Sequence, residues 1–411
     1  MNIIVLIKQS RSALLLLVLL VLGQLVWLAP ARAVTVGVFA EFTPSLNNPN
    51  NKTFTNTSPL SGVCSGTHKD WCKANNVFSI GVPSTGTKRG NGVADFGRGS
   101  IYYGLPEQRI ITVTSGTGET AEVIFRITGM AFRLRHYDLP ENGWVSDLSE
   151  LRGCSRVYSN NDSASNIMRI ITRDDNGAGG RSVCAFKMLA DREFSNWSWD
   201  IIYEIETPEP LNMKNGVYHG ATSYSRGGAG TDFDMGDGAF FDDPMVNINF
   251  QLTVNHMFAL DFAPGYETVN LQPLGGWNQW QEFGKVPATL RRDVPFRVSG
   301  STDFAVDINC EYTMPDGRCG ISNGPSTVPL DIAINMPGLM GHRGGMIAEA
   351  LNYPLQKDVF VPRFSPMREG AVFQRSSYLR FEVNGDPIKE MVTHPSTEYK
   401  GRVTVIFDAN M

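Results

Sequence analysis

Histidine is scarce in this sequence, and no two histidines stand at the spacing of metal ligands. A zinc site built on a histidine pair is therefore not predicted. No Ser-His-Asp order, paired carboxylates or phosphate-binding glycine loop stands out either. We expect no metal, no cofactor and no enzyme. The six histidines are His68, His136, His219, His256, His342 and His394.

Long apolar runs are also missing after the first thirty residues. The start of the chain carries Lys8 and Arg11, a leucine-rich run from Leu14 to Leu28, and the small residues Ala31 and Ala33 at the positions of a cleavage site. This order predicts a signal peptide over residues 1–33. A retained membrane anchor is the alternative, but the run is short for a span. We expect an exported chain that is soluble by itself.

Basic residues form no cluster in the remaining chain. Loss of Lys8, Arg11 and Arg32 with the signal peptide moves the formal net charge from −5 to about −8. Nucleic acid binding depends on clustered cations that neutralise phosphates. A nucleic acid partner is therefore not expected.

One serine lies in a pattern that resembles a nucleophile elbow, Gly320-Ile-Ser322-Asn-Gly324. Such an elbow needs a strand before the serine and a helix after it. Here Cys319 precedes the motif and Pro325 follows it. We expect a plain turn.

An acidic, glycine-rich loop spans residues 232–243. Its spacing departs from that of the known calcium loop, so a solvated loop is favoured and calcium binding stays open. The carboxylates concerned are Asp232, Asp234, Asp237, Asp242 and Asp243.

Only six cysteines are present, and they fall into three close pairs. In an exported chain this pattern indicates local disulfides, although the sequence alone allows fifteen connectivities. Zinc is the competing interpretation, but no Cys-x-x-Cys is present. The expected pairs are Cys64 with Cys72, Cys154 with Cys184, and Cys310 with Cys319, the last closing a hairpin at Pro315-Asp-Gly317.

β-Branched and aromatic runs, separated by Gly, Pro, Asn and Ser, dominate what remains. Many short strands with turn-rich spacers predict an all-β protein of sandwich type. Only Met346 to Leu351 is expected to form a helical turn. The clearest runs cover residues 109–114, 122–128, 199–205, 304–310, 328–334 and 378–383.

The alternating stretch 247–262 is longer than an ordinary strand and has a polar step at Asn255-His256. We interpret it as two strands of different domains joined almost directly. About 378 residues after the signal peptide also favour two domains. The expected boundaries are 34–254 and 257–411.

The final stretch alternates as a strand with one buried face, and only Ile406 is off the pattern. A strand at the end of the chain needs neighbours on both sides, or its backbone groups stay unpaired. The sequence therefore raises the question of which partner supplies a missing strand.

Several of these segments together resemble the two-domain tip adhesins of chaperone–usher pili, closest in layout to class 5 fimbrial tip proteins. Gly216-Val-Tyr218-His-Gly220 and residues 246–254 are similar to the end of an adhesin domain. Residues 258–262 are similar to a first pilin strand, and residues 399–407 to a last one. Residues 34–210 match only in overall pattern.

The resemblance implies two immunoglobulin-like β-sandwich domains, the second an incomplete pilin-type sandwich that lacks one strand. A chaperone strand would fill the gap in the periplasm, and an adjacent pilin subunit's donor strand would replace it. The donor-strand groove would be lined by Phe258, Leu260 and Phe262 on one side and by Val403, Val405 and Phe407 on the other.

The implied function is a fimbrial tip adhesin, exported through the periplasm to the cell surface at the fimbrial tip. The implied partners are a periplasmic pilus chaperone, an outer-membrane usher, the adjacent pilin subunit and a host receptor, for which a glycan is a candidate. The receptor-binding residues are unknown; Arg133 and Arg135 are one candidate pair, with an exposed strand face as the favoured alternative.

The alternative function is a secreted two-domain carbohydrate-active enzyme or carbohydrate-binding protein. Loop carboxylates are numerous enough to hide a catalytic pair. The alternatives differ in a simple property, because a complete enzyme should fold without a donor strand.

Overall fold

The computed structural model describes residues 33–409 except 45–50, 84–85, 91–95, 136–149, 164–165, 175–179, 188–190, 358–359, 368–370 and 395. The predicted signal peptide lies outside these residues, apart from Ala33. No helix in the described part of the chain is long and apolar enough to span a bilayer.

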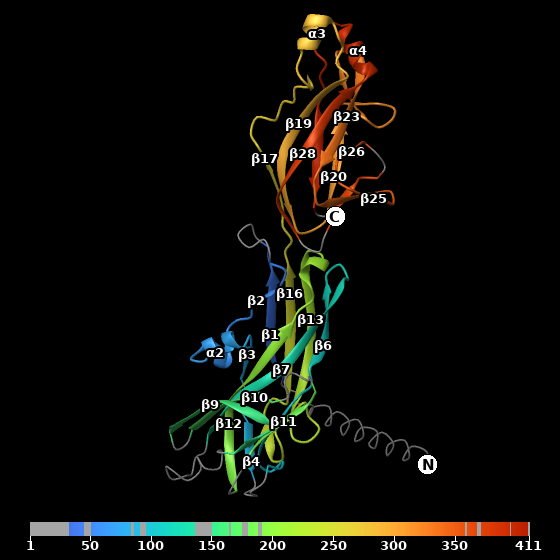
Figure 1. The fold of residues 1–411 in the computed structure, drawn as a ribbon. Helices are drawn as coiled ribbons and strands as arrows, with labels where there is room; N and C mark the ends of the chain where they lie inside the picture. Colours follow the sequence, from blue (N-terminus) through green and yellow to red (C-terminus); the bar gives the residue numbers. More distant parts are fainter. Residues whose placement is uncertain are drawn as a thin grey trace, which may run out of the picture.

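The described chain is all-β, which confirms the predicted fold class, and it forms two parts stacked end to end (Figure 1). Each part has its own hydrophobic core. Strand β16 ends the first part and β17 begins the second, with three residues between them.

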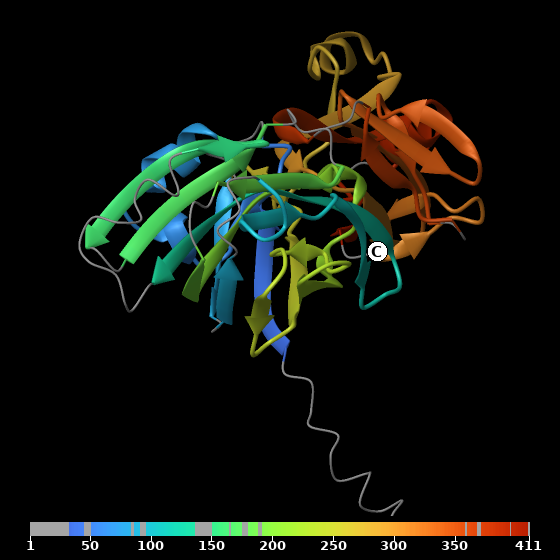
Figure 2. The ribbon, with the colours of Figure 1, turned by 90° about the horizontal axis from the view of Figure 1, so that it is seen from below.

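Sixteen strands of the first part are connected by one continuous network of backbone pairing. Seen from below in Figure 2, they curve around the core. They are β1 (Ala33–Phe42), β2 (Thr55–Asn56), β3 (Phe78–Pro83), β4 (Gly86–Gly90), β5 (Ile101–Leu105), β6 (Arg109–Ser115), β7 (Thr120–Arg135), β8 (Leu151–Arg152), β9 (Cys154–Ser163), β10 (Asn166–Arg173), β11 (Ser182–Phe186), β12 (Arg192–Glu206), β13 (Gly216–Gly227), β14 (Phe233–Asp234), β15 (Ala239–Phe241) and β16 (Met245–Val254).

The first strand of this part is built into the sheet along its whole length. β1 runs parallel to β16, from Ala33 opposite Met245 to Phe42 opposite Val254. Its other side pairs briefly with β2. Alternate residues of β1 and β16 enter the core, because successive side chains of a strand point to opposite faces.

The second part is a sandwich of two sheets. The eight-stranded sheet contains β17 (Phe258–Phe262), β18 (Gln272–Pro273), β19 (Thr289–Gly300), β21 (Tyr312–Thr313), β22 (Cys319–Ser322), β23 (Thr327–Asn335), β26 (Tyr353–Leu355) and β28 (Val372–Asn384). The five-stranded sheet contains β20 (Phe304–Cys310), β24 (Leu339–Arg343), β25 (Met346–Glu349), β27 (Arg363–Pro366) and β29 (Val403–Asp408).

Period-2 alternation explains the core between these sheets. In β23 the residues Val328, Leu330 and Ile332 are buried while their neighbours are not. In β20 the residues Val306 and Ile308 are buried on either side of the half-buried Asp307. Both sets belong to one cluster, so apolar rows from the two sheets pack against each other.

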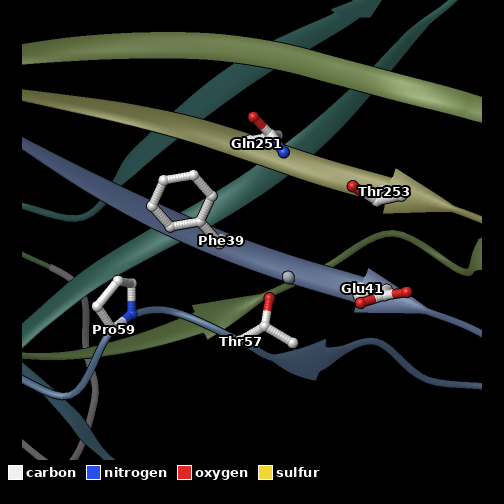
Figure 3. Close-up of a pocket in the computed structure, with 7 residues that line it drawn as sticks. Phe39, Glu41, Thr57, Pro59, Gln251 and Thr253 are labelled. Atoms are coloured by element: carbon white, nitrogen blue, oxygen red, sulfur yellow. The ribbon is translucent and has the colours of Figure 1, made fainter.

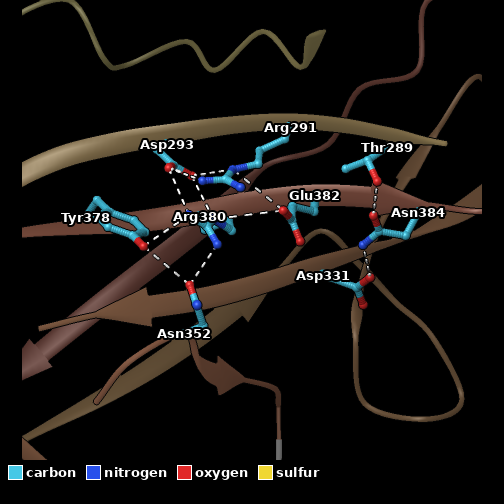
Figure 4. Close-up of polar contacts among 9 residues, drawn as sticks. All are labelled: Thr289, Arg291, Asp293, Asp331, Asn352, Tyr378, Arg380, Glu382 and Asn384. Atoms are coloured by element: carbon cyan, nitrogen blue, oxygen red, sulfur yellow. Dashed lines mark hydrogen bonds and ion pairs between the residues drawn. The ribbon is translucent and has the colours of Figure 1, made fainter. Parts of the chain in front are cut away.

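Charged pairs cover the outer face of the larger sheet (Figure 4). Arg380 and Arg291 contact Asp293 at 2.9 and 2.7 Å. Burial opposes ionisation of Asp293, but the hydrogen bonds from Arg380 and Arg291 outweigh it and lower the pKa of Asp293 to about 2. Arg380 also donates to Asn352 at 2.8 Å, which links the loop before β26 to β28.

Helices in the described residues are short and lie between strands. The expected helical turn at Met346 to Leu351 is wrong, because Met346–Glu349 is strand β25. Gly344 and Gly345 both have positive φ, and this two-residue turn folds β25 back onto β24 as a hairpin. The helices are η1 (Gly62–Ser65), α2 (Lys69–Ala74), η3 (Pro210–Asn212), α3 (Asn278–Phe283) and α4 (Asp386–Val392).

The junction between the two parts is held by His256. Its Nε2 lies 2.6 Å from the carbonyl oxygen of Met213 in the first part, and its Nδ1 lies 3.1 Å from Ser301 Oγ in the second. Burial lowers the pKa of His256. The carbonyl of Met213 can only accept a hydrogen bond, so Nε2 carries the proton and donates to it. In the neutral ring Nδ1 then accepts from the hydroxyl of Ser301.

The structure joins the six cysteines as Cys64–Cys72, Cys154–Cys184 and Cys310–Cys319. The third bridge spans the β21–β22 hairpin. In its turn the N–H of Gly317 donates to the carbonyl of Met314 at 3.0 Å. Gly317 has φ +84°, which favours glycine.

We predict that replacing Cys310 and Cys319 together by serine lowers the free energy of unfolding of the second part by about 2 to 3 kcal/mol, because the unfolded chain gains the freedom of an open loop. Urea unfolding measures the change, and the double replacement leaves no free thiol. Peptide mapping without reduction that joined Cys310 to Cys64 or Cys154 would contradict the pairing.

Candidate functional site

The candidate site is the pair of edge strands β17 and β29 in the second part. β17 is the first strand of the larger sheet and pairs with β19 alone, from Phe258 opposite Gly300 to Phe262 opposite Phe296. Within the described residues, no strand pairs with its other side. One row of β17 backbone groups is therefore free to pair.

β29 occupies the corresponding place in the smaller sheet. It pairs with β20 alone, from Val403 opposite Cys310 to Asp408 opposite Ala305. Just before β29, Lys400 exchanges two backbone hydrogen bonds with Ser322 of the larger sheet, at 2.9 and 3.0 Å. This contact fixes the start of β29, while its outer edge meets no other strand in the described chain.

The apolar rows of the two edges are only partly covered. Val403, Val405 and Phe407 are half-buried, whereas Val306 and Ile308 on the adjacent strand β20 are 0% and 2% exposed. In β17, Phe258 and Leu260 are half-buried, and Phe262 is 41% exposed. The core is thus closed beneath β20 and open between β17 and β29.

Aromatic side chains bridge this opening where the backbones do not. The ring of Phe407 lies 6.4 Å from that of Phe258 and 6.5 Å from that of Phe262, between ring centroids. It also lies 5.8 Å from Phe296 and 6.3 Å from Phe304. Phe407 therefore contacts aromatic rings of both sheets. The six residues predicted to line the groove lie on β17 and β29, and the side chains of these two strands are in contact through Phe407.

This arrangement suits the binding of an extended peptide. Two unpaired edges supply backbone donors and acceptors, and the apolar rows between them supply contacts for alternate side chains of an added strand. Such an element would gain backbone pairing and bury apolar surface together.

The two arginines proposed for receptor binding lie on β7. Arg133 is exposed between the buried Phe132 and Leu134, which is the strand-face alternation considered in the sequence. The side chain of Arg135 lies outside the described residues. Burial raises the pKa of Asp200 on β12, and the charge of Arg133 opposes part of that rise.

The acidic loop is bound by arginines and is not simply solvated as expected. Arg98 forms a bidentate pair with Asp234, at 2.6 and 2.9 Å, and also donates to Asp237. Asp234 is 5% exposed. Arg109 pairs with Asp232 at 2.6 Å. No cluster of three potential metal ligands occurs among the described residues.

The serine of the elbow-like motif lies at the end of β22, and strand β23 follows it. Ser322 Oγ donates to the carbonyl of Ser326 at 2.8 Å and accepts from the N–H of Gly324. These bonds are those of a turn, as expected, and they tie the hydroxyl to the backbone.

Comparisons with known proteins give little beyond this geometry. No protein-family model matches the chain, and no curated protein matches it. Among solved structures it is similar to a chaperone–tip adhesion subunit pre-assembly complex from the archaic chaperone–usher Csu pili of Acinetobacter baumannii. The identity is 12%, the match covers 92% of this chain and 98% of that one, and the TM-score is 0.23. So low a TM-score is not evidence of a shared fold.

The environment of Asp200 gives a testable pH dependence. Burial raises the pKa of Asp200 to about 6, against the attraction of Arg133 and the hydrogen bond from Val63. The folded state therefore holds a proton that the unfolded state releases, and stability falls as the pH rises from about 4 to 6.

We predict that Asp200→Asn stabilises the chain above pH 6 by about 1 to 3 kcal/mol and has little effect near pH 4, because the amide carries no charge to desolvate. Urea unfolding at both pH values measures the difference, with the exposed Asp70→Asn as control. An equal effect at both pH values would contradict the burial argument.

Proposed function

We propose that this chain is a fimbrial tip adhesin of the chaperone–usher type, completed by a donor strand bound between β17 and β29. The observation that carries the proposal is a pair of edges on different sheets that no further strand of the described chain pairs with, joined by half-exposed apolar side chains. A self-sufficient sandwich would cover such an opening with a strand of its own.

In this proposal residues 1–33 are the signal peptide, residues 34–254 the adhesin domain and residues 257–411 the pilin domain. The groove residues are Phe258, Leu260, Phe262, Val403, Val405 and Phe407. The partners are a periplasmic chaperone, the outer-membrane usher, the donor strand of an adjacent pilin subunit and a host receptor. The chain would then reach the cell surface at the fimbrial tip.

The pairing of β1 bears on whether this chain supplies a donor strand or accepts one. A donor strand offered to another subunit must be available for pairing, but β1 is hydrogen-bonded to β16 over ten residues. The first part therefore uses its first strand for its own sheet. This fits a subunit that accepts a donor strand and does not use β1 to supply one.

The alternative, a secreted carbohydrate-active enzyme or carbohydrate-binding protein, predicts a complete fold. A protein of that kind would be stably folded although no added strand pairs with β17 and β29. The experiments below separate the two functions by asking whether an added strand is needed.

The first prediction concerns the face of β29. Val405→Asp places a charge on the half-buried row and should abolish binding of a donor strand, because the carboxylate would have to be desolvated without a partner. Thr404→Asp, on the exposed face of the same strand, is the matched control and should bind normally. Co-purification of each variant with a tagged donor peptide expressed in the same cells measures both, and equal binding by the two variants would argue against the groove.

The second prediction concerns the whole chain. A strand of alternating apolar residues, fused after Met411 through a short flexible linker, should make the exported chain soluble and monomeric. Without it, the two exposed edges should cause aggregation or degradation. Size-exclusion chromatography with light scattering compares the two forms. If the unfused chain is monomeric and cooperatively folded by itself, the pilus function fails and the secreted alternative replaces it.

A further inference from the structure

A shallow hollow of about 310 Å³ lies on the flank of the first part, where β1 and β16 run side by side next to the segment after β2. This volume is at the lower end of the range for small-molecule sites. Its lining combines one aromatic ring with hydroxyl, amide and carboxylate groups (Figure 3). The lining residues are Phe39, Ala40, Glu41, Thr57, Pro59, Gln251 and Thr253.

The ring of Phe39 lies back along its own strand. A Cβ atom added to Gly37, two residues earlier on the same face, would stand only 2.5 Å from Phe39 Cε2. Any larger residue at position 37 would therefore push the ring away. With one side against Gly37, the half-buried ring is part of the lining of the hollow, and Figure 3 looks onto its face.

Polar side chains lie beside this ring because of the register between β1 and β16. The parallel pairing of β1 and β16 places Gln251 beside Phe39 and Thr253 beside Glu41. Thr57 and Pro59 close the opposite side (Figure 3). Nowhere in the described chain do the side chains of Gln251, Thr253 and Thr57 form a hydrogen bond, so their donors and acceptors are open to a ligand.

The hollow is held in shape by other bonds. The N–H of Phe39 donates to Ser58 Oγ at 2.8 Å, and the N–H of Thr57 donates to the carbonyl of Phe39 at 2.9 Å. Glu41 Oε1 accepts from Thr43 Oγ1 at 2.7 Å and from Asn255 Nδ2 at 3.1 Å. The backbone around Phe39 and the Glu41 carboxylate are thus fixed before binding, so they lose little conformational entropy when the ligand arrives.

The lining chemistry defines the ligand class. Among the residues that the structure describes, no lysine or arginine lines the hollow, so this lining offers no counter-charge to a phosphate, sulfate or carboxylate. Its backbone is already paired, since β1 lies between β16 and β2, so it does not add a peptide strand there. What remains is an apolar ring face edged by hydroxyl, amide and carboxylate groups, which matches a neutral ligand with one apolar face and several hydroxyl groups.

We propose that this hollow binds a neutral pyranose, with the sugar ring stacked on Phe39 and its hydroxyl groups bonded to Gln251, Thr253 and Glu41. In an adhesin such a site would recognise an uncharged terminal sugar of a receptor, an identification that rests on the proposed function. The carboxylate of Glu41 accepts hydrogen bonds from sugar hydroxyls, and Gln251 both donates and accepts.

The test uses the full mature chain, with the donor peptide added, and saturation-transfer NMR against glucose, galactose, mannose, their N-acetylated amino sugars and sialic acid. At least one neutral sugar should bind, and sialic acid should not. Binding of sialic acid alone, or of no sugar at tens of millimolar, would overturn the proposal.

Matched variants locate the binding. Phe39→Ala should weaken the affinity by about tenfold or more, because the stacking face is lost. Gln251→Ala, a milder change on the neighbouring strand, should weaken it several-fold. Phe240→Ala removes an aromatic residue that is 66% exposed outside the hollow and should leave the affinity unchanged. Equal affinity for all three variants would place the sugar elsewhere and overturn the assignment.

The two proposals fail separately. A folded chain that takes up the donor peptide and binds no sugar contradicts the sugar site alone. A chain that binds the sugar and does not take up the peptide contradicts the assembly function alone, and leaves a carbohydrate-binding protein.

Discussion

The need to pair backbone groups is the constraint on which the second part of this structure depends. β17 and β29 each use one side for pairing, and no other strand of the described residues pairs with the second side, although both lie over the same core. Phe407 contacts the rings of Phe258 in the larger sheet and Phe304 in the smaller one, but an aromatic ring cannot pair with the N–H and C=O groups along a strand edge. An added strand between these edges would pair with their backbone groups and cover the half-exposed apolar row in one step.

The same constraint connects the two parts of the chain. β16 is held between β1 and β13 in the first part, and only three residues separate it from β17. Within that short segment His256 bonds to Met213 on one side and to Ser301 on the other. A donor strand that fixed β17 would therefore also restrain the end of β16. β16 supplies Gln251 and Thr253 to the proposed sugar site.

Much of this architecture could be predicted from the sequence, because alternation of apolar residues needs no tertiary information. The strands at residues 304–310 and 328–334, and the polar step at Asn255-His256, were visible in this way. Contacts between distant residues were not: Arg98 and Asp234 are 136 residues apart, so the acidic loop looked solvated. The sequence did not predict the hollow at Phe39, because its lining comes from strands that are more than two hundred residues apart. The one local sign of it is Gly37, two positions before Phe39 on the same face of the strand.

Hydrogen–deuterium exchange of the mature chain, with and without a donor-strand peptide, tests the central claim most directly. Amides are protected when they enter backbone pairing. We predict that the peptide slows exchange in Phe258–Phe262 and Val403–Asp408 together, with smaller changes in β20 and β19, which are already paired. Full protection of both edges before the peptide is added, or peptide-induced protection confined to other strands, would contradict the account.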